Sequence, residues 1–166
     1  QIDLMKEMFD NFKNENTLFI SSILLLFNSN INIKNGGEYT LTGEFNYSII
    51  VNTEDDVTLN LNNVSINSSD TAAIANINSG ELTINLVKDT INTLKDNGSS
   101  ECDGALYSSG KLIINGSGKL NIYGNQEEGE GIATTDNDIT INGGDIYIES
   151  NDDGLNAGGD NYYKWR

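Results

Sequence analysis

Residues 104–123 read GALYSSGKLIINGSGKLNIY, and residues 131–149 read GIATTDNDITINGGDIYIE. The two segments share one layout, in which three short apolar pieces are separated by turns. A third copy opens at Gly154, Leu155 and Asn156. A sequence that repeats itself about every 20–30 residues is typical of a solenoid, because one such unit cannot bury its apolar side alone. The repeat therefore predicts a coil of stacked units.

Within each unit, apolar residues alternate with variable ones, which is the pattern of a strand that buries one face. Three sets of equivalent positions recur along the chain. The first set is Ile50, Ile74, Leu106, Ile132 and Leu155; the second is Val57/Leu59, Leu82/Ile84, Leu112/Ile114 and Ile139/Ile141; the third is Val64/Ile66, Leu120/Ile122 and Ile146/Ile148, with Ile91 to Leu94 filling the same place less regularly. Stacked units bury these residues as aliphatic ladders. The sequence predicts an all-β fold, a parallel β-helix of about four to five rungs.

Composition limits the function further. The 166 residues suit one domain, and the net charge of −16 excludes nucleic acid as a partner and disfavours anionic membranes. Such a charge repels itself unless cations bind. Cys102 is the one cysteine, so no intrachain disulfide forms, and the absence of histidine removes the commonest general base and transition-metal ligand.

The chain divides at about residue 30. Residues 1–30 are predicted to form an N-terminal cap or a remnant leader segment, with a short amphipathic helix from Ile2 to Phe12. Leu18–Phe27 is apolar but too short to cross a membrane, and it fits a cap over the solenoid end better than a signal peptide. Residues 31–166 form the β-helix, with an irregular rung at 31–47 and regular rungs at 48–71, 72–103, 104–129 and 130–153. No closing cap follows, and we expect a domain truncated at its C-terminus.

Acidic residues precede the first strand of each rung. Asp103, Glu130 and Asp153 are the main candidates for metal ligands, with Asp152, Glu128 and Glu101 beside them. Equivalent residues of stacked rungs lie about 4.8 Å apart, and two carboxylates at that distance repel by roughly 3–4 kcal/mol at an effective dielectric constant near 20. Oxygen-binding Ca²⁺ relieves such repulsion, so the turns predict a calcium site. The alternative is a solvated acidic edge screened by salt.

A second acidic column precedes the second strands and is interrupted by Lys111. Partial ion pairing there favours an ordinary surface over a metal site. This column comprises Glu54, Asp55, Asp56, Glu81, Asp136 and Asp138.

Tyrosine and tryptophan rings combine an apolar face with a polar edge, which suits stacking on sugars. The cluster of Tyr162, Tyr163 and Trp165 is the candidate carbohydrate site, although it could instead pack into a further rung. The other rung tyrosines, Tyr107, Tyr123 and Tyr147, are predicted to lie on different faces. Thr58, Thr83 and Thr140 form an outward row broken by Ile113, as expected of an exposed strand rather than an ice-binding surface.

Several segments together resemble a bacterial carbohydrate-binding domain family that is common in clostridia. They are YTLTG (39–43), IVNTEDDVTL (50–59), DTINTL (89–94), LIINGSGKL (112–120) and DITINGGDI (138–146) with Asp152-Asp153-Gly154. The resemblance covers roughly residues 37–160. It implies a right-handed parallel β-helix similar to pectate lyases, bound calcium, and binding of plant-type polysaccharide outside the cell or at its surface.

These observations predict non-catalytic, calcium-dependent binding of a pectin-like polysaccharide such as polygalacturonate, or of cellulose, by a monomer or a part of a larger surface protein. One alternative is a structural or adhesive solenoid stiffened by calcium. A polysaccharide lyase is a weaker alternative, because it needs a basic residue beside the metal, and Lys111 is the one lysine on a regular rung with carboxylates near it in register. A hydrolase needs two carboxylates at a set separation, which the sequence neither provides nor excludes.

Overall fold

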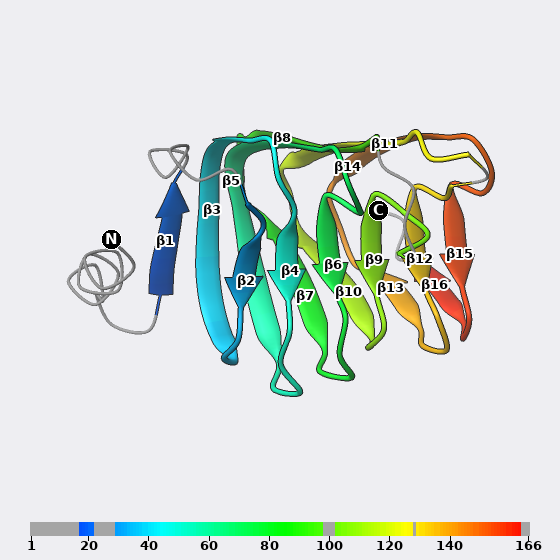
Figure 1. Ribbon diagram of the computed structural model, residues 1–166, viewed down its shortest axis with the longest axis horizontal. Coiled ribbons are helices and arrows are strands. Elements are labelled where there is room, and N and C mark those ends of the chain that lie inside the picture. The colour runs from blue at the N-terminus through cyan, green and yellow to red at the C-terminus, as the bar shows by residue number, and fades with distance from the viewer. Residues whose placement is uncertain (1–16, 22–28, 98–101, 128, 164–166) are drawn as a thin grey trace.

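The computed structural model describes residues 17–21, 29–97, 102–127 and 129–163. The described residues form a parallel β-solenoid of about four turns without a helix, which confirms the predicted fold class (Figure 1). The predicted helix at Ile2–Phe12 lies outside the described residues. Thr17–Ser21, within the expected N-terminal cap, forms strand β1, which pairs in parallel with β3.

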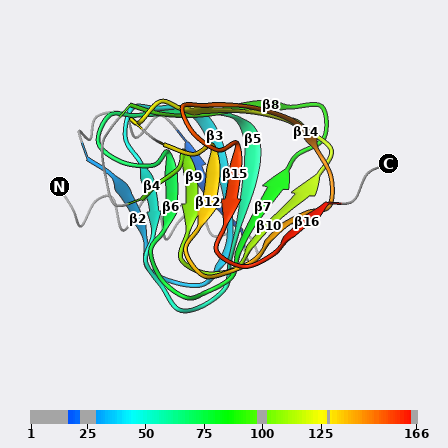
Figure 2. The same cartoon turned by 90° about the vertical axis from the view of Figure 1, so that its right-hand side faces the viewer.

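The strands stack into three faces, and Figure 2 looks along the stack. The first face contains β2 (Ile31–Ile33), β4 (Ile49–Val51), β6 (Ile74–Asn76), β9 (Leu106–Ser108), β12 (Ile132–Thr134) and β15 (Leu155–Ala157). The second face contains the first halves of β3 (Gly37–Phe45) and β5 (Val57–Ser68), followed by β7 (Leu82–Leu86), β10 (Leu112–Gly116), β13 (Ile139–Ile141) and β16 (Asn161–Tyr163). The third face contains the second halves of β3 and β5, followed by β8 (Ile91–Asp96), β11 (Lys119–Gly124) and β14 (Asp145–Ser150). All these pairings are parallel.

The core consists of the predicted aliphatic ladders. The second-face pairs Val57/Leu59, Leu82/Ile84, Leu112/Ile114 and Ile139/Ile141 lie in register as predicted. The first-face prediction was wrong at one position, because Ile49 rather than Ile50 pairs with Ile74. Ile49 and Val51 both point inward and are buried, while Ile50 is only half-buried. The segment at 31–47 is also more regular than predicted, since β2 and β3 pair with β4 and β5.

Asn92 places a polar side chain at an inward position in the middle of the third face. Asn92 pairs with Leu120 and is fully buried among aliphatic neighbours, while Ile91 beside it is 63% exposed. The Asn92 side chain accepts a hydrogen bond from the backbone N–H of Val64 and donates to Thr90 Oγ1 and to the carbonyl of Lys119. Val64 and Lys119 lie on the two neighbouring rungs, and Thr90 lies two residues earlier on the same rung. Both the oxygen and the nitrogen of the buried amide therefore have hydrogen-bond partners.

The second and third faces meet at what we call the second corner, where each rung places one residue with positive φ. These residues are Gly43, Asn63, Asp89, Gly116 and Gly144. At Gly116 the rungs stack closely, and a Cβ atom would lie 2.1 Å from the carbonyl oxygen of Leu86. Glycine is required there both for its backbone conformation (φ 97°) and for the close contact.

Candidate functional site

The acidic candidates lie at the third corner, where the chain passes from the third face to the next first-face strand. Asp103 lies between β8 and β9, Glu130 between β11 and β12, and Asp152 and Asp153 between β14 and β15. The register of Ile132 with Leu106 and Leu155, extended backwards, places Glu130 beside Gly104 and Asp153. The same register places Gly129 between Asp103 and Asp152. Glycines therefore interrupt the expected continuous column of carboxylates.

Glu130 is the one buried carboxylate among these candidates in the described part of the chain, with 3% of its surface exposed. Its Oε1 accepts a hydrogen bond of 2.6 Å from the Asn156 side-chain amide. Its Oε2 is buried and has no hydrogen-bond partner within the described residues. The exposed Asp103 carboxylate lies beside it. Burial, and then the interaction with Asp103, raise the pKa of Glu130, while the Asn156 hydrogen bond lowers it.

No cationic side chain among the described residues pairs with these two carboxylates. Two ionised carboxylates are both acceptors, so they cannot bond to each other without a shared proton or a cation. Glu130 and Asp103 are oxygen ligands of the kind Ca²⁺ prefers, and the unpartnered Oε2 fits a ligand atom. No group of three or more Asp, Glu, Cys or His residues gathers within the described ranges, so backbone carbonyls and water would complete a calcium shell.

Among the described candidates, neither Asp152 nor Asp153 joins this pair to make a group of three. Asp152 and Asp153 are exposed, and the carbonyl of Asp153 accepts the backbone N–H of Gly131. Glu101 and Glu128 lie outside the described residues. The structure thus brings Asp103 and Glu130 together, and these two carry the calcium hypothesis.

A buried acid beneath the third corner was missed from the sequence. Asp96, at the end of β8, is fully buried. Its Oδ1 accepts a hydrogen bond from the backbone N–H of Asn125, and its Oδ2 accepts one from Gln126 Nε2, both at 2.6 Å. Burial raises the pKa of Asp96, and these hydrogen bonds oppose that shift. Gln126 Nε2 also donates to the carbonyl of Cys102, which links this buried group to the turn that carries Asp103.

The signal for Asp96 was present in the alternation of its strand. Leu94 points inward, and Asp96 two residues later does the same in register with the buried Ser68. The polar residues that follow hide this signal, because the stretch from Lys95 to Asp103 has the composition of a solvated insertion. Inward polar residues recur at this corner, as Ser48 and Ser68 share a hydrogen bond of 2.7 Å between their hydroxyls.

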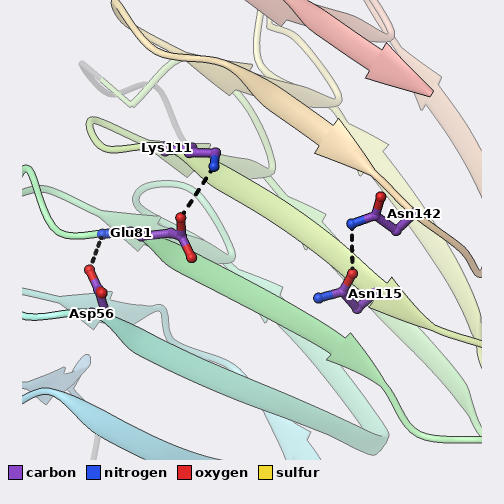
Figure 3. Close-up of polar contacts among 5 residues, drawn as sticks. All are labelled: Asp56, Glu81, Lys111, Asn115 and Asn142. Atoms are coloured by element: carbon purple, nitrogen blue, oxygen red, sulfur yellow. Dashed lines mark hydrogen bonds and ion pairs between the residues drawn. The ribbon is translucent and has the colours of Figure 1, made fainter. Parts of the chain in front are cut away.

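At the first corner, between the first and second faces, several acidic residues have partners within the protein. Lys111 Nζ lies 3.5 Å from Glu81 Oε2, and the backbone N–H of Glu81 donates to Asp56 Oδ1 at 3.0 Å (Figure 3). Asp138 similarly accepts the backbone N–H of Asp160 at 2.9 Å. The ion pair expected of Lys111 is present. These partners distinguish the first corner from the Glu130 pair.

The proposed terminal aromatic cluster is only partly described. Tyr162 is 51% exposed on the second face, in register with Thr140, and its hydroxyl donates to Asp160 at 3.0 Å. Tyr163 lies in register with the inward-facing Ile141, and Trp165 lies outside the described residues.

Two other tyrosines lie closer together than predicted. Tyr123 on β11 and Tyr147 on β14 were expected on different faces, but both point outward from the third face. Their ring centroids are 6.2 Å apart, with an interplanar angle of 59°. They lie on neighbouring strands in diagonal positions, since Tyr147 pairs with Asn121 and Tyr123 pairs with Glu149. The sequence contained a signal for this arrangement. Tyr123 directly follows the aliphatic pair Leu120/Ile122 of one rung, and Tyr147 lies between Ile146 and Ile148 of the next.

From β5 to β13, the second face presents two rows of uncharged side chains, and Glu38 on β3 lies in register with Thr58 beside them. The predicted row of Thr58, Thr83, Ile113 and Thr140 lies in register. Behind it, asparagines bond to one another along the stack: Asn85 Nδ2 donates to Asn60 Oδ1 at 2.7 Å, and Asn142 Nδ2 donates to Asn115 Oδ1 at 2.9 Å (Figure 3). These bonds stabilise the stacking of rungs.

Comparison with known proteins supplies one finding. A family model described as "Carbohydrate-binding domain-containing protein" matches residues 27–162. Comparisons with curated proteins and with solved structures gave no match. The described part of the chain has no helix that is long and apolar enough to cross a membrane.

Proposed function

Since the chain belongs to the carbohydrate-binding domain-containing protein family, we propose that it binds plant-type polysaccharide without catalysis and with the help of calcium. The family match over residues 27–162 carries the carbohydrate part of this proposal. Polygalacturonate and cellulose are the proposed polymers. The proposed location is outside the cell or at its surface, where free calcium and such polymers occur together.

The calcium part of the proposal is supported by one observation, the buried Glu130 Oε2 without a partner beside the Asp103 carboxylate. A bound Ca²⁺ would neutralise both carboxylates and link the turns that carry them. A cation at this corner would also help a protein of net charge −16 to approach an anionic polymer, because it lowers the local repulsion.

A retention assay tests the proposal. The protein is passed over immobilised polygalacturonate and over cellulose, each with calcium and with a chelator, and the eluate is assayed for unsaturated sugars. We expect calcium-dependent retention without unsaturated product. Retention with product would favour the lyase, in which Lys111 would be the residue to change. The absence of retention, with calcium still raising the melting temperature, would contradict carbohydrate binding and favour the structural solenoid.

A further inference from the structure

The outward surface of the third face gathers the features of a sugar-binding site. Its neighbouring strands β8, β11 and β14 present Thr93, Asn121 and Tyr147 in one row. The next row contains Lys95, Tyr123 and Glu149. The two tyrosine rings are in contact, and Tyr147 is 49% exposed.

The fold does not need these rings for its core. The inward positions of the same strands are filled by Leu120, Ile122, Ile146 and Ile148. Tyr123 and Tyr147 alternate with these residues and therefore point toward solvent. The exposed Tyr147 ring and the half-buried Tyr123 ring together form an apolar patch with polar edges, which matches the face of a pyranose ring and its hydroxyl groups.

A lysine, Lys95, lies beside this patch. Lys95 is in register with Tyr123 on the neighbouring strand, and the backbones of the two strands lie about 4.8 Å apart. Lys95 makes no ion pair with any other residue that the structure describes, whereas Lys119 on the same face lies 3.6 Å from Asp145. On the opposite side of Tyr123, Glu149 accepts a hydrogen bond from the Tyr147 hydroxyl. A ligand carboxylate is therefore attracted toward β8 and repelled from β14.

The other two faces lack this combination. On the first face, the Tyr107 hydroxyl is hydrogen-bonded to Ser109 and Thr135. On the second face, Tyr162 lies at the last described strand, and the asparagine amides bond to one another (Figure 3). Only the third face, among the described residues, combines two rings in contact with a lysine that lacks an acidic partner.

We propose that Tyr123 and Tyr147 stack on the sugar rings of an acidic polysaccharide and that Lys95 pairs with a uronate carboxylate. This inference rests on the proposed function and deepens it by naming the surface and by favouring a polyuronate over cellulose. The charge-assisted contact of Lys95 sets the preference, since stacking alone does not distinguish an acidic polymer from a neutral one.

Affinities for polygalacturonate and for its fully methyl-esterified form test the proposal, with calcium present throughout. We expect Tyr123→Ala and Tyr147→Ala each to weaken binding of both polymers by about tenfold, which corresponds to about 1.4 kcal/mol. Lys95→Gln should weaken polygalacturonate binding by about tenfold and leave the methyl-esterified polymer within about twofold. The matched control, Lys34→Gln, should bind both polymers as the unmodified protein does. Tyr162→Ala tests the competing candidate site on the second face, and binding that persists in this variant separates the two surfaces.

The calcium-induced rise in melting temperature should remain in all five variants, which shows that they fold and keep the third corner. Unchanged binding by Tyr123→Ala and Tyr147→Ala would overturn the surface assignment. If Tyr162→Ala alone lost binding, the glycan would lie on the second face, and the proposed function would survive without this inference. If the unmodified protein bound neither polymer, both would fail.

Discussion

At the scale of the residue, Glu130 differs from the other acids of the two acidic corners. Glu81 has Lys111, and Asp56 and Asp138 have backbone N–H groups, so their charges have partners. Glu130 has Asn156 on one oxygen and a second carboxylate beside the other. Burial makes the ionised form of Glu130 costly, because a charge removed from water is stable only when it is paired. The calcium hypothesis depends on this difference.

Glu130→Gln tests the role of this residue. Without calcium, the amide can donate to Asp103 and removes the buried charge, so we expect the free energy of unfolding to rise by on the order of 1–3 kcal/mol. For a chain of this size, each kcal/mol shifts the melting temperature by about 2–4 °C. Calcium should raise the melting temperature of the unmodified protein but have little effect on the variant. Differential scanning calorimetry with chelator or calcium measures both effects.

Glu54→Gln is the matched control, because Glu54 is exposed at the first corner and the change removes the same charge. It should respond to calcium as the unmodified protein does. A Glu130→Gln variant with an undiminished calcium response would contradict a metal site at this pair.

At the scale of the element, register decides which side chains are buried. The first-face strands contain three residues each, so a shift by one residue exchanges the inward and outward side chains. The segment Ile49–Val51 has apolar residues at all three positions, and its alternation alone does not identify the inward pair. Parallel pairing with Ile74–Asn76 does, since it places Ile49 beside Ile74 in the core.

Alanine substitutions at Ile49 and at Ile50 test the register. Ile49→Ala removes a fully buried side chain and should lower the free energy of unfolding by about 2–5 kcal/mol. Ile50→Ala removes a half-buried side chain on the outward row and should cost less than about 1 kcal/mol. Urea unfolding followed by circular dichroism compares the two variants. Equal losses, or a larger loss at Ile50, would contradict the observed register.

At the scale of the whole molecule, charge links stability to pH. The protein has a net charge of −16, and the described part of the chain contains two buried acids, Asp96 and Glu130, whose pKa values are raised mainly by burial. The unfolded chain has ordinary values of about 3.9 for Asp and 4.3 for Glu. Between those values and the raised ones, the folded state binds more protons than the unfolded state. The stabilisation is therefore complete at low pH and is lost as pH rises through the raised pKa values.

We expect the melting temperature in chelator to rise as the pH is lowered from 7 toward the ordinary pKa values of these two acids. In 1 M salt the Debye length is about 3 Å, so repulsion between surface charges is screened and the remaining rise belongs to the buried acids. Glu130→Gln should reduce that remaining rise. With saturating calcium the trend should weaken or reverse, because protons compete with the metal for Glu130. A melting temperature in chelator and 1 M salt that does not change with pH would contradict the assigned role of these two acids.

The sequence by itself determined the fold. Alternation with a period of two and the repeat of 20–30 residues predict short stacked strands, because only stacking buries the apolar side of such units. It also determined the position of the acidic turns. Only the tertiary structure decided which residues meet: Asp103 with Glu130, Tyr123 with Tyr147, and Asp96 with Gln126. These contacts join different rungs and depend on turn lengths of a few residues, which set the register and are not encoded in the alternation.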